Sequence, residues 1–288
     1  MVTNTAVAVG WVLAGTVLFT LVYASAKFSG GAISSFQIVW LRYLGGFATV
    51  VMLARSGGSL RRFQSRQPAN HLFRAVLGCS AGVAVIQSSA MMPIMDATAI
   101  GLLNVVIVVV LGALVLKEHV SLGHWAAVAV STLGAGLVVQ ARGAFQGGST
   151  MWPSAIALAG AILLALEALL IRRLSQSEAP LTVLLYVNFF GVWLMAIPAI
   201  LSWTSMSLGQ FVSCCALGPL AISAQYCVIR GYRLAPVSVL GPVDYTWLVF
   251  AALLGVVAFS EVPGPGVLLG AGLIIVGGVL LIQASGDQ

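Results

Sequence analysis

The chain has 288 residues, of which 60% are hydrophobic and 7% are charged, and its formal net charge is +6. A soluble domain carries about a quarter charged residues, so this composition excludes a soluble globular protein and indicates that lipid surrounds most of the chain. The positive charge alone would fit nucleic-acid binding, but the positions of the basic residues indicate membrane topology instead.

Ten apolar segments follow one another along the chain. Each is close to the roughly 20 residues that a helix needs to cross the hydrocarbon core, and backbone groups in hydrocarbon must bond within their own segment, so each is predicted to be helical. None alternates polar and apolar residues as barrel strands do. The first begins near Met1 without a basic leader and is expected to be an uncleaved span. We predict an all-α membrane protein with spans 6–26, 33–54, 71–91, 96–116, 121–140, 152–171, 180–202, 209–229, 235–258 and 265–284.

The basic residues predict the orientation of these spans. With Met1 inside, only Lys27 and Arg142 lie in outward loops, and Arg42 lies within a span. Lys and Arg are enriched in cytoplasmic loops, so we expect a multi-pass protein of the cell inner (cytoplasmic) membrane with both termini cytoplasmic. The inward loops are then predicted to hold Arg55, Arg61, Arg62, Arg66, Arg74, Lys117, Arg172, Arg173, Arg230 and Arg233.

The second half of the chain repeats the first. Pro93–Gln140 aligns without a gap with Pro236–Gln283, a shift of 143 residues that also matches Glu118 to Glu261. We read Glu118 and Glu261 as turn residues at membrane edges. We predict two repeats, residues 1–145 and 146–288, each with five transmembrane helices. Because five is odd, the second repeat enters the membrane the other way up, which is one way of building alternating access in transporters.

Three short motifs follow one another in the first half, and looser copies of the last two occur in the second half. They are Gln37-x-x-x-Leu41-Arg42-Tyr43-Leu44, Met92-Pro93-x-Met95-Asp96-Ala97-Thr98-Ala99 and Leu116-Lys117-Glu118-His119-Val120-Ser121, with looser copies at Leu234-Ala235-Pro236-Val237-Ser238 and Phe259-Ser260-Glu261-Val262-Pro263. With the ten-span frame, they make the chain resemble the drug/metabolite transporter superfamily and, within it, the EamA family. The resemblance implies two inverted five-helix repeats around a central cavity and transport of small organic metabolites, often export. Asp244 and Tyr245 depart from the family pattern, in which small or hydroxyl residues are expected.

Asp244 is the deepest charge in a predicted span. It lies eleven residues past Arg233, about 16 Å along a helix, and it follows Gly241-Pro242, where proline can open the helix. A charge at the bilayer centre costs roughly 2.5–3.5 kcal/mol on insertion scales, and such residues are usually functional. We predict that Asp244 binds substrate or a proton, with an internal packing pair as the alternative.

Two further charges lie within predicted spans. The guanidinium of Arg42 suits a carboxylate, either that of a substrate or that of Asp244. Glu167 lies five residues before Arg172, about 7.5 Å along the helix, so it either contacts substrate or a proton, or reaches towards the inner headgroups.

Uncharged polar and aromatic residues complete the predicted substrate-binding set. A metabolite site needs apolar and aromatic walls with a few polar groups, although each such residue alone is more typical of a helix–helix hydrogen bond. Asn104 and Trp247 occupy equivalent positions in the two repeats, as do Gly101 and Asp244. The full set is Asp244, Arg42, Tyr245, Trp247, Asn104, Tyr23, Gln87 and Glu167.

The chain lacks the short motifs of nucleotide-binding pumps, serine hydrolases and zinc proteases. Its histidines and cysteines show no metal-binding spacing, so we expect no enzyme, no cofactor, no metal and no nucleic acid. We predict a secondary transporter that moves a small organic metabolite by alternating access, with an amino acid or related compound favoured over a riboflavin-like vitamin or a carboxylate. A lipid flippase and a non-transporting assembly or sensor subunit are the alternatives. The expected partners are the substrate and the bilayer. Gly266-x-x-x-Gly270 allows close packing within the chain or, as an alternative, in a homodimer.

Overall fold

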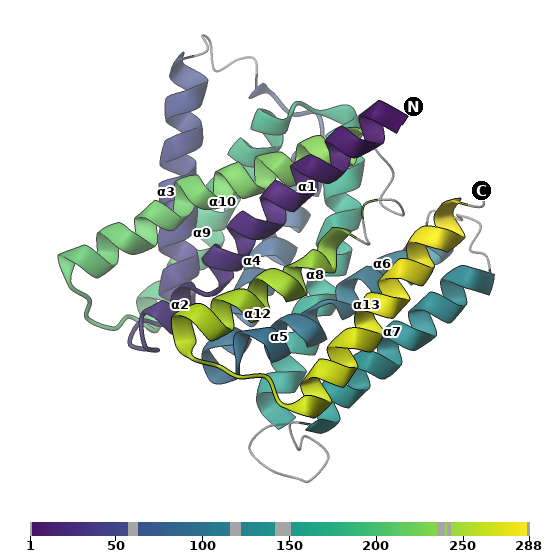
Figure 1. The fold of residues 1–288 in the computed structure, drawn as a ribbon. Coiled ribbons are helices and arrows are strands. Elements are labelled where there is room, and N and C mark those ends of the chain that lie inside the picture. The colour runs from purple at the N-terminus through teal and green to yellow at the C-terminus, as the bar shows by residue number, and fades with distance from the viewer. Residues whose placement is uncertain are drawn as a thin grey trace.

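The computed structural model describes residues 2–56, 63–115, 122–141, 151–234, 240 and 243–286. Every regular element among them is a helix (Figure 1), which confirms the all-α class. By length and composition, six helices are long and apolar enough to cross a membrane, and four shorter apolar helices coincide with the remaining predicted spans. The helices are α1 Val2–Tyr23, α2 Ser25–Phe28, α3 Ser35–Ser56, α4 Pro68–Met91, α5 Ile94–Gly101, α6 Leu103–Val115, α7 Leu122–Ala141, α8 Met151–Ser177, α9 Pro180–Leu201, α10 Leu208–Leu234, α12 Thr246–Phe259 and α13 Pro265–Gly286.

Local sequence explains where several helices begin and end. Pro68 and Pro180 occupy the first turns of α4 and α9, where the missing N–H of proline is not needed. α12 ends at Ser260, which adopts a left-handed conformation (φ 53°). The N–H of Glu261 then donates to the carbonyl of Gly255 over 3.0 Å, which gives a partner to one of the carbonyl groups left free at the helix end. This turn directs the chain from α12 back towards α13.

The fifth helices of the two repeats, α7 and α13, pack side by side (Figure 1). Glycines allow the close approach, because a Cβ atom on Gly134 would lie 2.6 Å from the carbonyl oxygen of Gly270, and one on Gly266 would lie 2.8 Å from the Cβ of Ala141. Residue numbers rise along one helix as they fall along the other, so the two helices are antiparallel. The glycines predicted to allow close packing are thus used within the chain.

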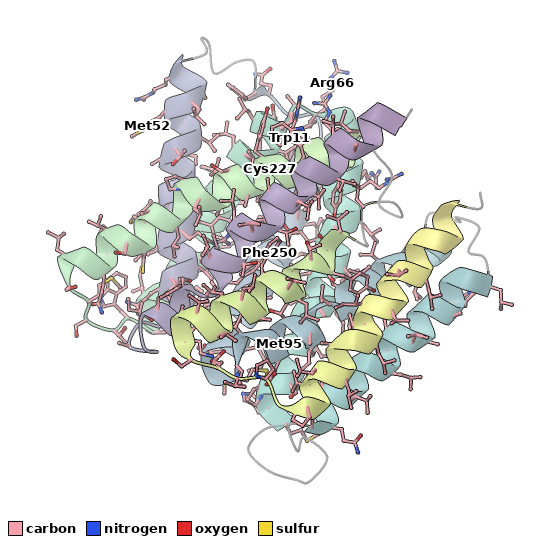
Figure 2. The ribbon with its side chains drawn as sticks, in the orientation of Figure 1. Trp11, Met52, Arg66, Met95, Cys227 and Phe250 are labelled. Atoms are coloured by element: carbon pink, nitrogen blue, oxygen red, sulfur yellow. The ribbon has the colours of Figure 1, made fainter. Side chains whose placement is uncertain are left out.

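The other helix pairs that join the repeats follow the same rule. The second helices, α3 and α9, pair with each other, and the first helix of each repeat packs against the third helix of the other, as α1–α10 and α8–α4. All three pairs are antiparallel: for example, Gly15 faces Val228 whereas Gly231 faces Val12. Figure 2 labels Trp11 on α1 and Cys227 on α10 at one of these interfaces. The second repeat is therefore inverted relative to the first.

The fourth helix of each repeat is broken at an equivalent position. A turn at Leu102 separates α5 from α6, and a turn at Tyr245 precedes α12. The N–H of Val105 donates to the Leu102 carbonyl and that of Leu248 to the Tyr245 carbonyl, each over 3.1 Å. Leu102 and Tyr245 are related by the same 143-residue shift as the sequence repeat. Broken helices in corresponding positions of two inverted repeats are typical of transporter binding sites.

The opening predicted at Gly241-Pro242 lies outside the described residues, as do the predicted turn residue Glu118 and most of the link between the repeats. The break that the structure places in this span is at Tyr245, one residue beyond Asp244. Glu261 lies in the connection between α12 and α13, where a turn residue was expected.

One polar cluster joins the repeats at the end of the molecule where α4 begins and α8 ends. We call Ser65, His71, Glu178 and Tyr186 the His71 cluster. The imidazole of His71 is fully buried, forms a 2.7 Å contact with the Glu178 carboxylate and stacks on the Tyr186 ring at 4.8 Å. The Ser65 hydroxyl also donates to Glu178. Glu178 lies in the turn between α8 and α9 and Tyr186 lies in α9, and together they cover the imidazole.

A second polar cluster joins the repeats at the opposite end. We call Lys27, Met92, Ile94 and Glu261 the Glu261 cluster. Lys27 forms an ion pair with Glu261 and donates to the Met92 carbonyl over 3.0 Å. The other Glu261 oxygen accepts the N–H of Ile94 over 3.0 Å, at the first residue of α5, where free N–H groups favour a carboxylate.

Candidate functional site

A cavity lies between the two repeats, with an empty volume of about 650 Å³ that includes open solvent. It is bordered by both first helices, α1 and α8, by α6 and α10, and by the chain on each side of the Tyr245 break. Five of the eight predicted site residues are among its walls. The lining residues are Thr16, Phe19, Tyr23, Asn104, Leu164, Glu167, Ala168, Ile171, Gln225, Val228, Tyr232, Asp244 and Trp247.

The two helix breaks place three of these residues. Asn104 comes two residues after the break at Leu102, and Trp247 comes two residues after the break at Tyr245. Asp244 comes directly before the second break, so its side chain projects where the helix is interrupted. Both breaks therefore border the same cavity, and each contributes polar or aromatic side chains to it.

Aromatic rings form one wall of the cavity. The rings of Tyr23 and Trp247 lie 5.3 Å apart, and Phe19 stacks on Tyr23 with ring centres 5.4 Å apart. Tyr23 comes from the first repeat and Trp247 from the second, so this wall spans the boundary between the repeats. Offset ring pairs at these distances are favourable, which holds the wall in place.

Glu167 lies on the cavity wall and is paired with Arg74. The Nε of Arg74 lies 3.6 Å from Oε1 of Glu167, and a second guanidinium nitrogen donates to the side-chain oxygen of Gln225. Arg74 is fully buried and the Glu167 side chain is only 8% exposed. Gly78 leaves room for the carboxylate, since a Cβ there would lie 2.8 Å from Glu167 Oε1.

This pairing corrects two predictions. Arg74 was expected in an inward loop, but α4 begins at Pro68, so Arg74 lies almost two turns inside a helix. One of the two predictions for Glu167 was that its side chain reaches towards the inner headgroups. It turns instead to Arg74 on the neighbouring helix, because a buried carboxylate is tolerated only with a counter-charge.

Asp244 is half-buried and lines the cavity. Among the described residues, it forms neither an ion pair nor a hydrogen bond. The suggested pair between Arg42 and Asp244 is therefore absent from the part of the chain that the structure describes. Asp244 differs in this respect from Glu167, whose charge is already matched.

Arg42 does not line the cavity. Its guanidinium carbon lies 4.4 Å from the centre of the Tyr43 ring, and the side chain is buried. A cation above an aromatic face is an established favourable contact. In this structure Arg42 therefore contacts the neighbouring Tyr43 ring, and its suggested pair with Asp244 is not seen among the described residues.

Gln87 and Tyr245 also lie outside the cavity lining. Gln87 accepts a hydrogen bond from the Ser35 hydroxyl over 2.7 Å, and the hydroxyls of Tyr245 and Ser131 lie 3.2 Å apart. Both contacts join one helix to another. The structure thus gives these two residues the helix–helix bonds that any single polar residue in a span most often makes.

Several lining residues were not predicted. Gln225 lies within the predicted span 209–229 but is not in the predicted substrate-binding set. Thr16 and Phe19 precede Tyr23 by seven and four residues, so all three fall on one face of α1, and this spacing is a signal that could have found them. Tyr232 near the end of α10 had no comparable signal.

Among the described residues, no group of three or more His, Cys, Asp or Glu side chains could hold a metal ion. The site instead consists of one paired and one unpaired carboxylate, amide groups and an aromatic wall. It can bind a small amphipathic molecule, with polar atoms contacting its charged groups and apolar atoms contacting its rings.

Two inverted five-helix repeats with broken fourth helices around a shared cavity define a membrane transporter. The sequence profile of the EamA-like transporter family matches the chain twice, at residues 6–140 and 151–283. The chain belongs to the EamA-like transporter family, as its motifs indicated.

Named relatives are similar over most of their length. The chain is 22% identical over 283 residues to a riboflavin transporter of Vibrio cholerae, covering 95% of this chain and 92% of the relative. It is 26% identical over 272 residues to the pseudopaline exporter CntI of Pseudomonas aeruginosa, covering 92% and 90%. A solved crystal structure aligns over 100% of this chain and 99% of its own length, with a TM-score of 0.70 at 20% identity, which shows a shared fold.

Proposed function

We propose that this protein is a secondary carrier that moves a small organic metabolite across the cytoplasmic membrane by alternating access. The observation that supports this most directly is the single cavity bordered by both equivalent helix breaks. In transporters built from inverted repeats, such breaks expose backbone and polar groups to the substrate near the bilayer midplane.

In this proposal the cavity residues have distinct roles. Asp244 is the polar anchor for the substrate or for a coupling proton, because no other described residue satisfies its charge. Tyr23 and Trp247 contact the apolar part of the substrate. The Arg74–Glu167 pair fixes α4 against α8 and orients the amide of Gln225. Rocking of one repeat against the other then exposes the cavity to each side in turn.

Amino acids and related amines are the favoured substrates, because the cavity is small and presents carboxylates. A riboflavin-like vitamin is the next candidate, since the aromatic wall suits a flat ring system and two relatives are named riboflavin transporters. We place both termini in the cytoplasm on the basis of the basic loops.

Counterflow in proteoliposomes tests this function. Vesicles containing the full-length protein are loaded with amino acids, dicarboxylates, nucleobases or riboflavin, and uptake of the labelled compound is followed. Exchange of one class by the wild type, lost in Asp244→Asn, is the expected result. Exchange that survives this substitution would support the carrier function but contradict the assignment of Asp244 to the binding site.

Two other functions predict different outcomes. A flippase would translocate labelled lipid and show no exchange of soluble compounds. An assembly or sensor subunit would show neither activity and would copurify with a partner protein. No exchange of any soluble compound by well-folded protein, with lipid translocation or a bound partner, would overturn the proposed carrier.

A further inference from the structure

The charges around the cavity are unequal. Two carboxylates line it, Glu167 and Asp244. Arg74 lies 3.6 Å from Glu167 and matches its charge. Asp244 has no such partner among the residues that the structure describes. One negative charge is therefore available to whatever enters.

Among the described residues that line this cavity, none has a basic side chain. Arg74 is turned towards Glu167 and Gln225, and its side chain is fully buried. Arg42, the other buried arginine among the described residues, lies over the Tyr43 ring and does not line the cavity, although its charge also acts on Tyr23 and Glu167. An anionic group of a ligand would thus meet Asp244 without a lysine or arginine to bind it, and like charges in a site of low polarity repel strongly.

The aromatic wall favours the same kind of ligand as the Asp244 carboxylate. Tyr23 lies between Phe19 and Trp247, with ring centres 5.4 Å and 5.3 Å away, and all three rings line the cavity that Asp244 also lines. The faces of aromatic rings attract cations, and aromatic cages are a known means of binding organic ammonium groups. A protonated amine satisfies both features, whereas an uncharged polar group satisfies neither fully.

We propose that the cavity selects organic cations, namely molecules with a protonated amine on an apolar or aromatic body, with Asp244 binding the ammonium group. The inference rests on the proposed carrier function and narrows its substrate class. Among the substrates named above, it favours amines with a net positive charge and disfavours amino acids, which are zwitterions, because no cationic side chain among the described lining residues would bind their carboxylate.

The test uses three probes of matched size that differ in charge: phenethylamine, 2-phenylethanol and 3-phenylpropionate. Binding to the full-length protein in lipid nanodiscs is measured by calorimetry at neutral pH. A charge-assisted contact contributes about 1.5–3 kcal/mol, so the amine should bind roughly 10-fold to 150-fold more tightly than the alcohol. The carboxylate should bind more weakly than either.

Three substitutions locate the effect. Asp244→Asn should bring the affinities for the amine and the alcohol within about 3-fold of each other. Asp244→Glu keeps the charge and should keep the preference. Asp287→Asn removes a carboxylate next to the end of the chain and should leave all three affinities unchanged.

Equal binding of the amine and the alcohol by the wild type, tighter binding of the carboxylate, or no binding of the amine would overturn the inference. So would a preference that survives Asp244→Asn. Counterflow distinguishes a failure of this inference from a failure of the proposed function. Exchange without a preference for amines contradicts only the substrate class, and amine binding without any exchange contradicts only the carrier function.

Discussion

The buried Arg74–Glu167 ion pair gives a prediction whose size follows from its geometry. At 3.6 Å and an effective dielectric constant of about 20, the two charges attract by about 4–5 kcal/mol. Glu167→Gln leaves the fully buried guanidinium without a counter-charge, and breaking such pairs costs about 3–5 kcal/mol. We therefore expect Glu167→Gln and Arg74→Met each to lower the free energy of unfolding by about 3 kcal/mol or more. The double substitution should cost clearly less than the sum, since it buries no unpaired charge.

The free energies come from reversible unfolding of the purified full-length protein in mixed detergent micelles, followed by circular dichroism. The four forms make a double-mutant cycle, and a coupling energy of about 2 kcal/mol or more is expected. Glu261→Gln is the matched control. It breaks an ion pair whose side chains are 19% and 18% exposed, against 0% and 8% for Arg74 and Glu167, so its cost should be smaller, about 1–2 kcal/mol.

Additive single effects, with a coupling energy below about 0.5 kcal/mol, would show that the two charges do not stabilise each other. A cost for Glu167→Gln no greater than that for Glu261→Gln would show that burial has no influence on these ion pairs. Either result would refute the reasoning.

Three further predictions concern close contacts. Gly134→Ala should destabilise the protein by about 1–3 kcal/mol through overpacking against α13, whereas Gly136→Ala, with open space around its Cβ, should be neutral or stabilising by up to about 1 kcal/mol; thermal unfolding of both variants checks this. Gly78→Ala should displace the paired carboxylate of the cavity and reduce counterflow about 10-fold or more, and an unchanged rate in folded protein would contradict it. Lys27→Met should weaken the Glu261 cluster. In a cysteine-free protein with Thr16→Cys in the cavity, a membrane-impermeant thiol reagent added on the side of the Glu261 cluster should then label this cysteine about 3- to 5-fold faster. An unchanged labelling rate would show that the Glu261 cluster does not restrict access to the cavity from its side.

The helical spans and the inverted arrangement of the two repeats could be predicted from the sequence. Long apolar segments define spans because hydrocarbon offers no other partner for the backbone, and an odd number of spans in each repeat requires the inversion that the antiparallel pairs display. The cost of burying charge also directed attention to Asp244 and Glu167, both of which line the cavity.

The sequence was insufficient for the direction in which a side chain points. α12 is apolar on all sides, so no amphipathic pattern tells which face of the helix meets the cavity. Trp247 lines it whereas Tyr245, two residues earlier, bonds to Ser131. Arg74 was missed for another reason. An arginine near the end of an apolar segment has the same sequence signature whether it reaches the headgroups or pairs with a distant carboxylate.

The His71 and Glu261 clusters are not copies of each other. The His71 cluster joins an imidazole to a carboxylate, whereas the Glu261 cluster joins a lysine and backbone groups to a carboxylate, so different contacts hold the two ends. Two identical inverted repeats would give inward-facing and outward-facing states of equal energy. In the proposed carrier different contacts would break at each end, and every 1.4 kcal/mol of difference would change the ratio of the two populations tenfold. In the proposed carrier, the residues that differ between the two repeats therefore determine whether the inward-facing or the outward-facing state is more populated without substrate.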